Sequence, residues 1–148
     1  MSDVIAISRR LDEIELLLER LRKPDVGGVP RAFTPTYVGT TPGVTTYTTQ
    51  EGFYTIANGI VVARATIIWT GATGSGSIRL GGLPFVATYD VAFPVWTQNV
   101  TFANGSVQGV LQAGNAVAQL FSPATNAAGT ELTVEVAGTI RYCIVYLA

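Results

Sequence analysis

The hydrophobic periodicity of the chain changes at residues 24–31, and this change divides the sequence into two parts. In the first part, apolar residues recur with alternating spacings of three and four, which is the a/d rhythm of a coiled coil. These residues are Val4, Ile7, Leu11, Ile14, Leu18 and Leu21. The pattern predicts a coiled-coil helix over residues 1–23, a linker rich in proline and glycine over 24–32, and a separate domain over 33–148.

The residues at the helix core favour more than two strands. Leucine at a positions with isoleucine at d positions shifts the preference from dimers to trimers or tetramers, and Arg10 at g can pair with Glu15 at the next e. Residues 10–15 also resemble the short trimerisation motif of parallel coiled coils. The alternative is an amphipathic helix packed on its own domain. We therefore predict a homotrimer held by Val4, Ile7, Arg10, Leu11, Ile14, Glu15, Leu18 and Leu21, with a further contribution from the second part of the chain because so short a helix is marginal alone.

The second part is typical of an all-β domain. Thr, Val, Ile, Tyr and Phe dominate, and Gly, Pro and Asn interrupt them roughly every ten residues. We expect an antiparallel β-sandwich or jelly-roll-like fold. The expected strands span residues 33–38, 52–57, 60–69, 75–80, 89–96, 100–102, 106–111, 116–121 and 132–147.

Three local signals refine this expectation. Asn58-Gly59 is the strongest short hairpin signal and should join the second and third strands. Gly138 should mark a bulge or bend in the long last segment. Residues 140–147 are apolar on both faces, so this strand should lie centrally in a sheet or meet a neighbouring subunit.

The distribution of charge limits the classes of partner. The formal net charge is -1, which provides no basic field for nucleic acid or an anionic membrane. Most of the charged residues lie in residues 1–25, so the β part has a charge-poor surface. Because a free monomer normally carries a mixed charged exterior, we expect other protein to cover much of this surface. The sequence contains neither a signal peptide nor an apolar run long enough to span a membrane.

Catalytic and ligand-binding motifs are not apparent. The sequence has no histidine and one cysteine, Cys143, which excludes an internal disulfide and a Cys/His zinc site; we expect the thiol to pack as a small apolar side chain. Residues 71–77 are rich in glycine but lack the lysine of a phosphate-binding loop, so they are expected to form a turn. No Asp-rich calcium loop is present. We expect no cofactor and no metal.

Two groups of side chains allow a functional interpretation. The carboxylates of Glu131 and Glu135 should share one face of a strand, but without a histidine base we expect a surface edge and no enzyme. Seven aromatic residues could form a carbohydrate platform or belong to the strand core, and the strand pattern favours the core. They are Trp69, Phe85, Tyr89, Phe93, Trp96, Tyr142 and Tyr146.

Three short motifs carry a resemblance to a known kind of protein. They are Phe33-Thr34-Pro35-Thr36-Tyr37, the hairpin over residues 50–61, and Gly82-Leu83-Pro84-Phe85. Together they resemble a recurrent module of bacteriophage virion proteins, found in tail fibres and spikes, head fibres and capsid-decorating proteins. The resemblance implies a trimeric β-sandwich that is made in the host cytoplasm and built into the virion.

Within that group, the resemblance and the short N-terminal helix favour a capsid decoration (cement) protein or short head fibre. Its partners would be two further copies of itself and the major capsid protein or another virion protein. The alternative is a short tail fibre that recognises a host surface glycan.

The helix hypothesis makes a direct prediction. Changing Leu11 and Leu18 together to Asp places charges in the helix core, so the trimer should dissociate if the helix contributes to it. Light scattering at micromolar concentration should then give the monomer mass, whereas the unchanged chain should give the trimer mass. A monomer mass for the unchanged chain would contradict the coiled-coil interpretation.

Overall fold

The computed structural model describes residues 14–15, 28–103, 105–124 and 127–148. Of the predicted trimerisation residues, Ile14 and Glu15 are therefore described, and both are helical and exposed. Six others lie outside the described residues: Val4, Ile7, Arg10, Leu11, Leu18 and Leu21. The coiled coil and the trimer remain predictions.

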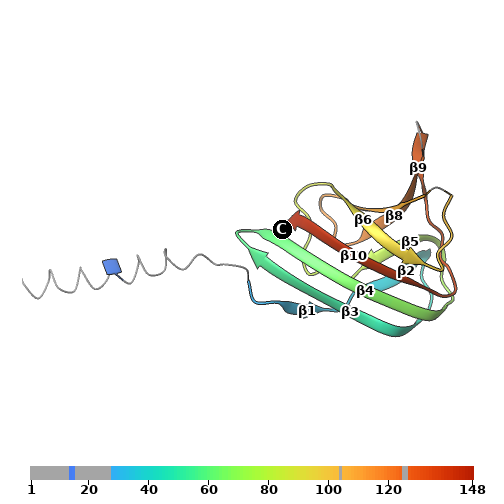
Figure 1. Ribbon diagram of the computed structural model, residues 1–148, viewed down its shortest axis with the longest axis horizontal. Helices are drawn as coiled ribbons and strands as arrows, with labels where there is room; N and C mark the ends of the chain where they lie inside the picture. The colour runs from blue at the N-terminus through green and yellow to red at the C-terminus, as the bar shows by residue number, and fades with distance from the viewer. Residues whose placement is uncertain (1–13, 16–27, 104, 125–126) are drawn as a thin grey trace, which may run out of the picture.

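The β part forms one continuous antiparallel sheet (Figure 1). Its strands are β1 (Arg31–Phe33), β2 (Thr36–Thr41), β3 (Thr45–Ala57), β4 (Ile60–Ala72), β5 (Ser75–Gly81), β6 (Val91–Gln98), β7 (Val107–Leu111), β8 (Ala118–Ala124), β9 (Ala127–Glu131) and β10 (Gly138–Leu147). The strand order is β1-β3-β4-β10-β6-β7-β8-β5-β2, and β9 pairs with β8 outside this path. The expected mainly-β antiparallel fold is confirmed, but the described strands belong to one curled sheet and not to two separate ones.

The sheet curls because its two end strands are neighbours in the sequence. Phe33 at the end of β1 pairs with Gly52 of β3, and Thr36 at the start of β2 pairs with Gly81 of β5. Thr34 and Pro35 alone connect them, so opposite ends of the sheet are held close together. The curl encloses the hydrophobic core on its inner face.

The core follows the alternation of inward and outward side chains that a strand imposes. On β4 and β10, every second side chain is buried, including Val61, Ile67, Ile140 and Ile144. The hydroxyl of Tyr142 is also buried and has no hydrogen-bond partner among the described residues. Burial raises the pKa of this hydroxyl, which keeps it protonated.

A polar and aromatic seam closes the curl between β2 and β4. The ring of Tyr37 stacks on that of Trp69, with centroids 4.0 Å apart and planes 24° apart. The indole Nε1 of Trp69 donates to the carbonyl of Glu135 at 2.9 Å, and the backbone N–H of Glu135 donates to the Tyr37 hydroxyl at 2.8 Å. The Tyr47 hydroxyl accepts a hydrogen bond from the Tyr37 N–H at 2.9 Å. Burial raises the pKa of Tyr37 to about 12.

The predicted hairpin turn at Asn58-Gly59 is confirmed. Asn58 and Gly59 have φ values of 50° and 77°, as the tight β3–β4 hairpin requires. Gly82 has a φ of 78°, and Phe85 after it packs against the core, edge-on to the Tyr54 ring with centroids 5.5 Å apart. The glycine-rich turn is shorter than expected, because β4 continues to Ala72 and β5 begins at Ser75.

Several strand predictions are wrong in their bounds. The expected strand 33–38 is broken at Pro35, because the chain passes there from one end of the sheet to the other. Residues 100–102 form no strand, and β9 (Ala127–Glu131) was missed. The expected strand 132–147 begins only at Gly138, where a Cβ would lie 2.8 Å from the Trp69 ring. The central position of this strand, β10, is confirmed, because it pairs with β4 and β6.

The seam predicts a specific loss of stability. Changing Tyr37 to Phe leaves the partly buried N–H of Glu135 without its acceptor, which should lower the free energy of unfolding by about 1–3 kcal/mol. Chemical denaturation at neutral pH measures this loss. Tyr142→Phe is the matched control, because it removes a buried hydroxyl without a partner and should be neutral or stabilising. Equal effects of the two changes would contradict the role given to the seam.

The pH dependence of the same variant gives a second test. The raised pKa of Tyr37 means that the native state keeps a proton which the unfolded state loses above its ordinary pKa of 10. The contribution of this proton to stability is complete below pH 10 and is lost as the pH rises towards 12. Tyr37→Phe should therefore flatten the fall in unfolding free energy over this interval.

Candidate functional site

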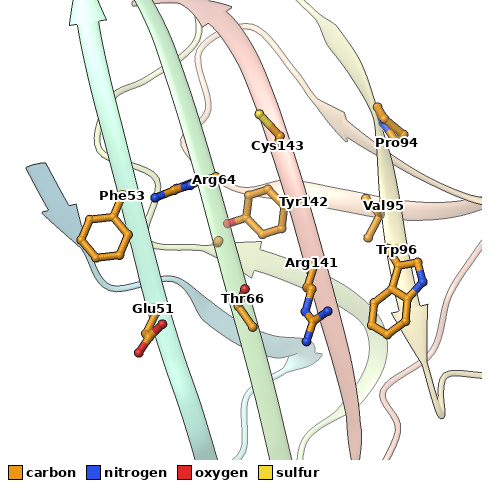
Figure 2. A pocket seen from close by; sticks show the side chains of 11 residues that line it. Glu51, Phe53, Arg64, Thr66, Pro94, Val95, Trp96, Arg141, Tyr142 and Cys143 are labelled. Carbon is orange, nitrogen blue, oxygen red and sulfur yellow. The ribbon is translucent and has the colours of Figure 1, made fainter. Parts of the chain in front are cut away.

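A groove lies on the outer face of the sheet, across β3, β4, β10 and β6, with a volume of about 600 Å³ (Figure 2). We call it the outer groove. The strand register places its outward side chains in two rows. The first row is Glu51, Thr66, Arg141 and Trp96, and the second is Phe53, Arg64 and Cys143.

Each row sets an arginine beside an aromatic ring. The guanidinium carbon of Arg141 lies 5.0 Å from the Trp96 ring centroid, and that of Arg64 lies 5.7 Å from the Phe53 centroid. Figure 2 shows these side chains arising from different strands of the sheet. Such cation–π contacts contribute about 0.5–1 kcal/mol at exposed sites, enough to bias the orientation of both arginines.

The outer groove carries a net positive charge, because two arginines and one glutamate line it. Among the described residues, an ion pair joins Arg79 to Glu131 at 3.3 Å. Neither Arg64 nor Arg141 forms an ion pair with a described residue. Arg64 pairs in register with Cys143, two residues from Arg141, so the two arginines are diagonal neighbours on the outer face. The two guanidinium groups lean in opposite directions, one towards β3 and the other towards β6, so each can bind an anionic group of its own.

The aromatic residues divide between core and surface. The core interpretation is confirmed for Trp69, Phe93, Tyr142 and Tyr146, which are buried, and Phe85 packs against the core. Trp96 and Tyr89 do not fit it, because they are 50% and 64% exposed. The sequence analysis did not predict the outer groove. The alternation of buried and exposed residues on β4 does place the Arg64 side chain on the outer face.

Two further predictions about side chains are wrong. Cys143 does not pack in the core but is exposed on the outer face of β10, because residues of its parity point outward there. Glu131 and Glu135 do not share a strand face, because Glu131 ends β9 and Glu135 lies in the loop before β10. A carboxylate oxygen of Glu135 accepts the backbone N–H of Thr101 at 3.3 Å, which holds that loop.

The described part of the chain contains neither a metal-binding cluster nor a membrane-spanning helix. No group of three or more His, Cys, Asp or Glu side chains that could hold a metal ion occurs among the described residues. None of the described helical residues forms a helix long and apolar enough to cross a membrane. The outer groove, with two arginines and the half-exposed Trp96, is the candidate functional site.

Comparison with known proteins shows a likeness of fold. No protein-family model matches the sequence, and a search of curated proteins finds no match. Among solved structures, the chain is similar to the crystal structure of the Dettilon tailspike protein (gp208), with a TM-score of 0.62 and 13% identity. The likeness covers 81% of this chain and 24% of the tailspike chain, so this chain spans about a quarter of that protein's length. The chain thus has a fold also found within a tailspike.

Proposed function

We propose that the protein is a structural protein of a bacteriophage virion and acts by binding, without catalysis. The observation that carries this proposal is the fold shared with part of a tailspike. The three motifs that resemble phage modules support it, because each forms a structural junction of this fold. The Pro35 motif crosses between sheet ends, Asn58-Gly59 closes a hairpin, and Gly82 begins the turn that brings Phe85 to the core.

In this proposal the protein is a homotrimer made in the host cytoplasm and assembled into the particle. The heptad pattern of residues 1–23 supports the trimer. The charge-poor β surface supports protein partners over nucleic acid or membrane, because the buried centres of protein interfaces are depleted in charge.

One location for the trimer is the capsid surface. There it would serve as a decoration (cement) protein or short head fibre that binds the major capsid protein or another virion protein and stabilises the shell. Exposed apolar side chains of the loops, such as Val86 and Val136 at 52% and 68%, favour such protein contacts.

The other location is the tail, where the protein would be a receptor-binding fibre. The outer groove favours this second candidate, because an exposed Trp96 ring and two unpaired arginines are suited to a saccharide that carries a carboxylate. A sugar ring would pack on the face of Trp96, while the neighbouring Arg141 guanidinium would bind the acid.

Copy number in purified virions separates the two locations. Decoration proteins occur in hundreds of copies per particle and tail fibres in about a dozen, as expected from the repetition of capsid and tail symmetry. Quantitative gel densitometry against the major capsid protein measures this number, and imaging of intact particles locates the protein. If the protein were missing from purified virions, the proposal itself would fail.

If the protein is a glycan-binding tail fibre, the binding of its ligand should depend on the negative charge of the sugar. Trp69 is 1% exposed and Trp96 is 50% exposed, so acrylamide should quench mainly the Trp96 fluorescence. Saturating glucuronate should protect Trp96, and Arg141→Gln should weaken this binding by about 10- to 100-fold, the value of a hydrogen bond to a charged group. Arg31→Gln is the matched control, since Arg31 is an exposed arginine of β1 that does not line the groove.

Neutral glucose separates sugar stacking from charge recognition in this assay. Equal protection by glucose and glucuronate would contradict the role of the arginines. If glucuronate at tens of millimolar did not protect Trp96, the outer groove would no longer support a location on the tail. The proposal of a capsid location would be unaffected.

A further inference from the structure

Four exposed apolar side chains form a compact patch beside the outer groove. Ile60, Val62, Val145 and Leu147 are 45%, 40%, 53% and 42% exposed. The register pairs Val62 with Val145 and Ile60 with Leu147, directly across β4 and β10. We call these four residues the apolar strip.

The apolar strip departs from the ordinary pattern of a half-exposed strand. An antiparallel sheet that faces water on one side places polar side chains outward, and isolated apolar exceptions are common. Here two consecutive cross-strand pairs are apolar, and Thr55 and Ala57 continue the same rows on β3 without adding charge. Such a continuous uncharged surface can be buried without removing a charge from water.

The apolar strip lies where the chain enters the β domain. A Cβ on Gly28 would lie 2.5 Å from the carbonyl oxygen of Ile56, so the start of the described β part runs against the end of β3. The backbone N–H of Ala148 donates to the carbonyl of Gly59 at 2.9 Å, which places the other chain end at the same turn. Ile60 directly follows this turn. Residues 1–27 are therefore attached to the domain at the end that carries the apolar strip.

We propose that the apolar strip is the surface through which the β domains of a homotrimer pack on one another. This inference rests on the proposed trimer and specifies its contact surface. A coiled coil would tether three domains by their Gly28 ends, giving a high effective concentration of the surfaces nearest the tether. Around a three-fold axis, the residues nearest the axis meet their own equivalents, so a surface that is apolar and uncharged is suited to this position.

The proposal also supplies the contribution that the helix needs. A coiled coil of about 20 residues is marginal in isolation. Burying the exposed parts of three apolar strips adds hydrophobic stabilisation in proportion to the apolar area removed from water. The charged rows of the outer groove begin one residue pair beyond Val62 and Val145, where Arg64 pairs with Cys143. The domain contact can therefore end before the outer groove and leave it accessible.

Glutamate substitutions in the full-length chain test this contact. Val145→Glu and Val62→Glu should each raise the dissociation constant of the trimer by at least about tenfold, because association would bury an unpaired carboxylate. Analytical ultracentrifugation over a dilution series measures this constant. Thr70→Glu is the matched control, because Thr70 is an exposed outward residue of β4 near its other end. It should leave the constant unchanged.

Cross-linking tests the same contact without a destabilising charge. A Val145→Cys change in a Cys143→Ser background should give covalent trimers or dimers with a short bismaleimide, and Thr70→Cys in that background should not. If neither glutamate changed the dissociation constant and residue 145 gave no cross-link, the apolar strip would not be the contact surface. The proposal of a trimer would still hold. A monomeric unchanged chain would overturn the trimer itself.

Discussion

The two-residue connection between β1 and β2 is the constraint on which the rest of the fold depends. Phe33 and Thr36 are three Cα steps apart, a span of about 11 Å at most, yet they pair at opposite ends of a sheet path. The sheet therefore cannot lie flat, and its curl is fixed by covalent geometry. The Gln50 side chain donates to the carbonyl of Pro35 at 2.8 Å and anchors this connection to β3.

The curl creates an interior that must be filled and whose polar groups must be satisfied. Trp69 fills this interior at the seam, and its indole N–H donates a hydrogen bond to the carbonyl of Glu135. The Tyr37 hydroxyl accepts a hydrogen bond from the Glu135 N–H. Backbone groups of the loop before β10 thus find partners on two strands, as buried polar groups require. Gly138 completes the arrangement, because a side chain there would collide with the indole.

The sequence predicts the locally determined parts of this fold well. Asn58-Gly59 specifies its own hairpin, and the two apolar faces of residues 140–147 identify a central strand. It predicts the non-local parts poorly. Pro35 occurs within a run of strand-forming residues, and nothing local indicates that the two sides of this proline join different ends of the sheet. The strand β9 is rich in alanine and glycine, which are weak strand signals.

The outer groove was unpredicted for a similar reason. Arg64, Arg141 and Trp96 are far apart in the sequence, and each alone is an ordinary outward residue of a strand. Only the register of three strands makes them neighbours. Alternation assigns each to the outer face, but the register that aligns them depends on the hairpin and on the central position of β10.

Both described ends of the β domain, at Gly28 and Ala148, lie beside the turn at Gly59. The loops at the opposite end, around Gly43 and Gly74, carry neither chain end and lie against each other. A domain of this kind can be fused to different neighbouring segments, because each new junction changes the structure at one end of the domain alone. Its far loops are then the place where sequence can diversify without disturbing attachment.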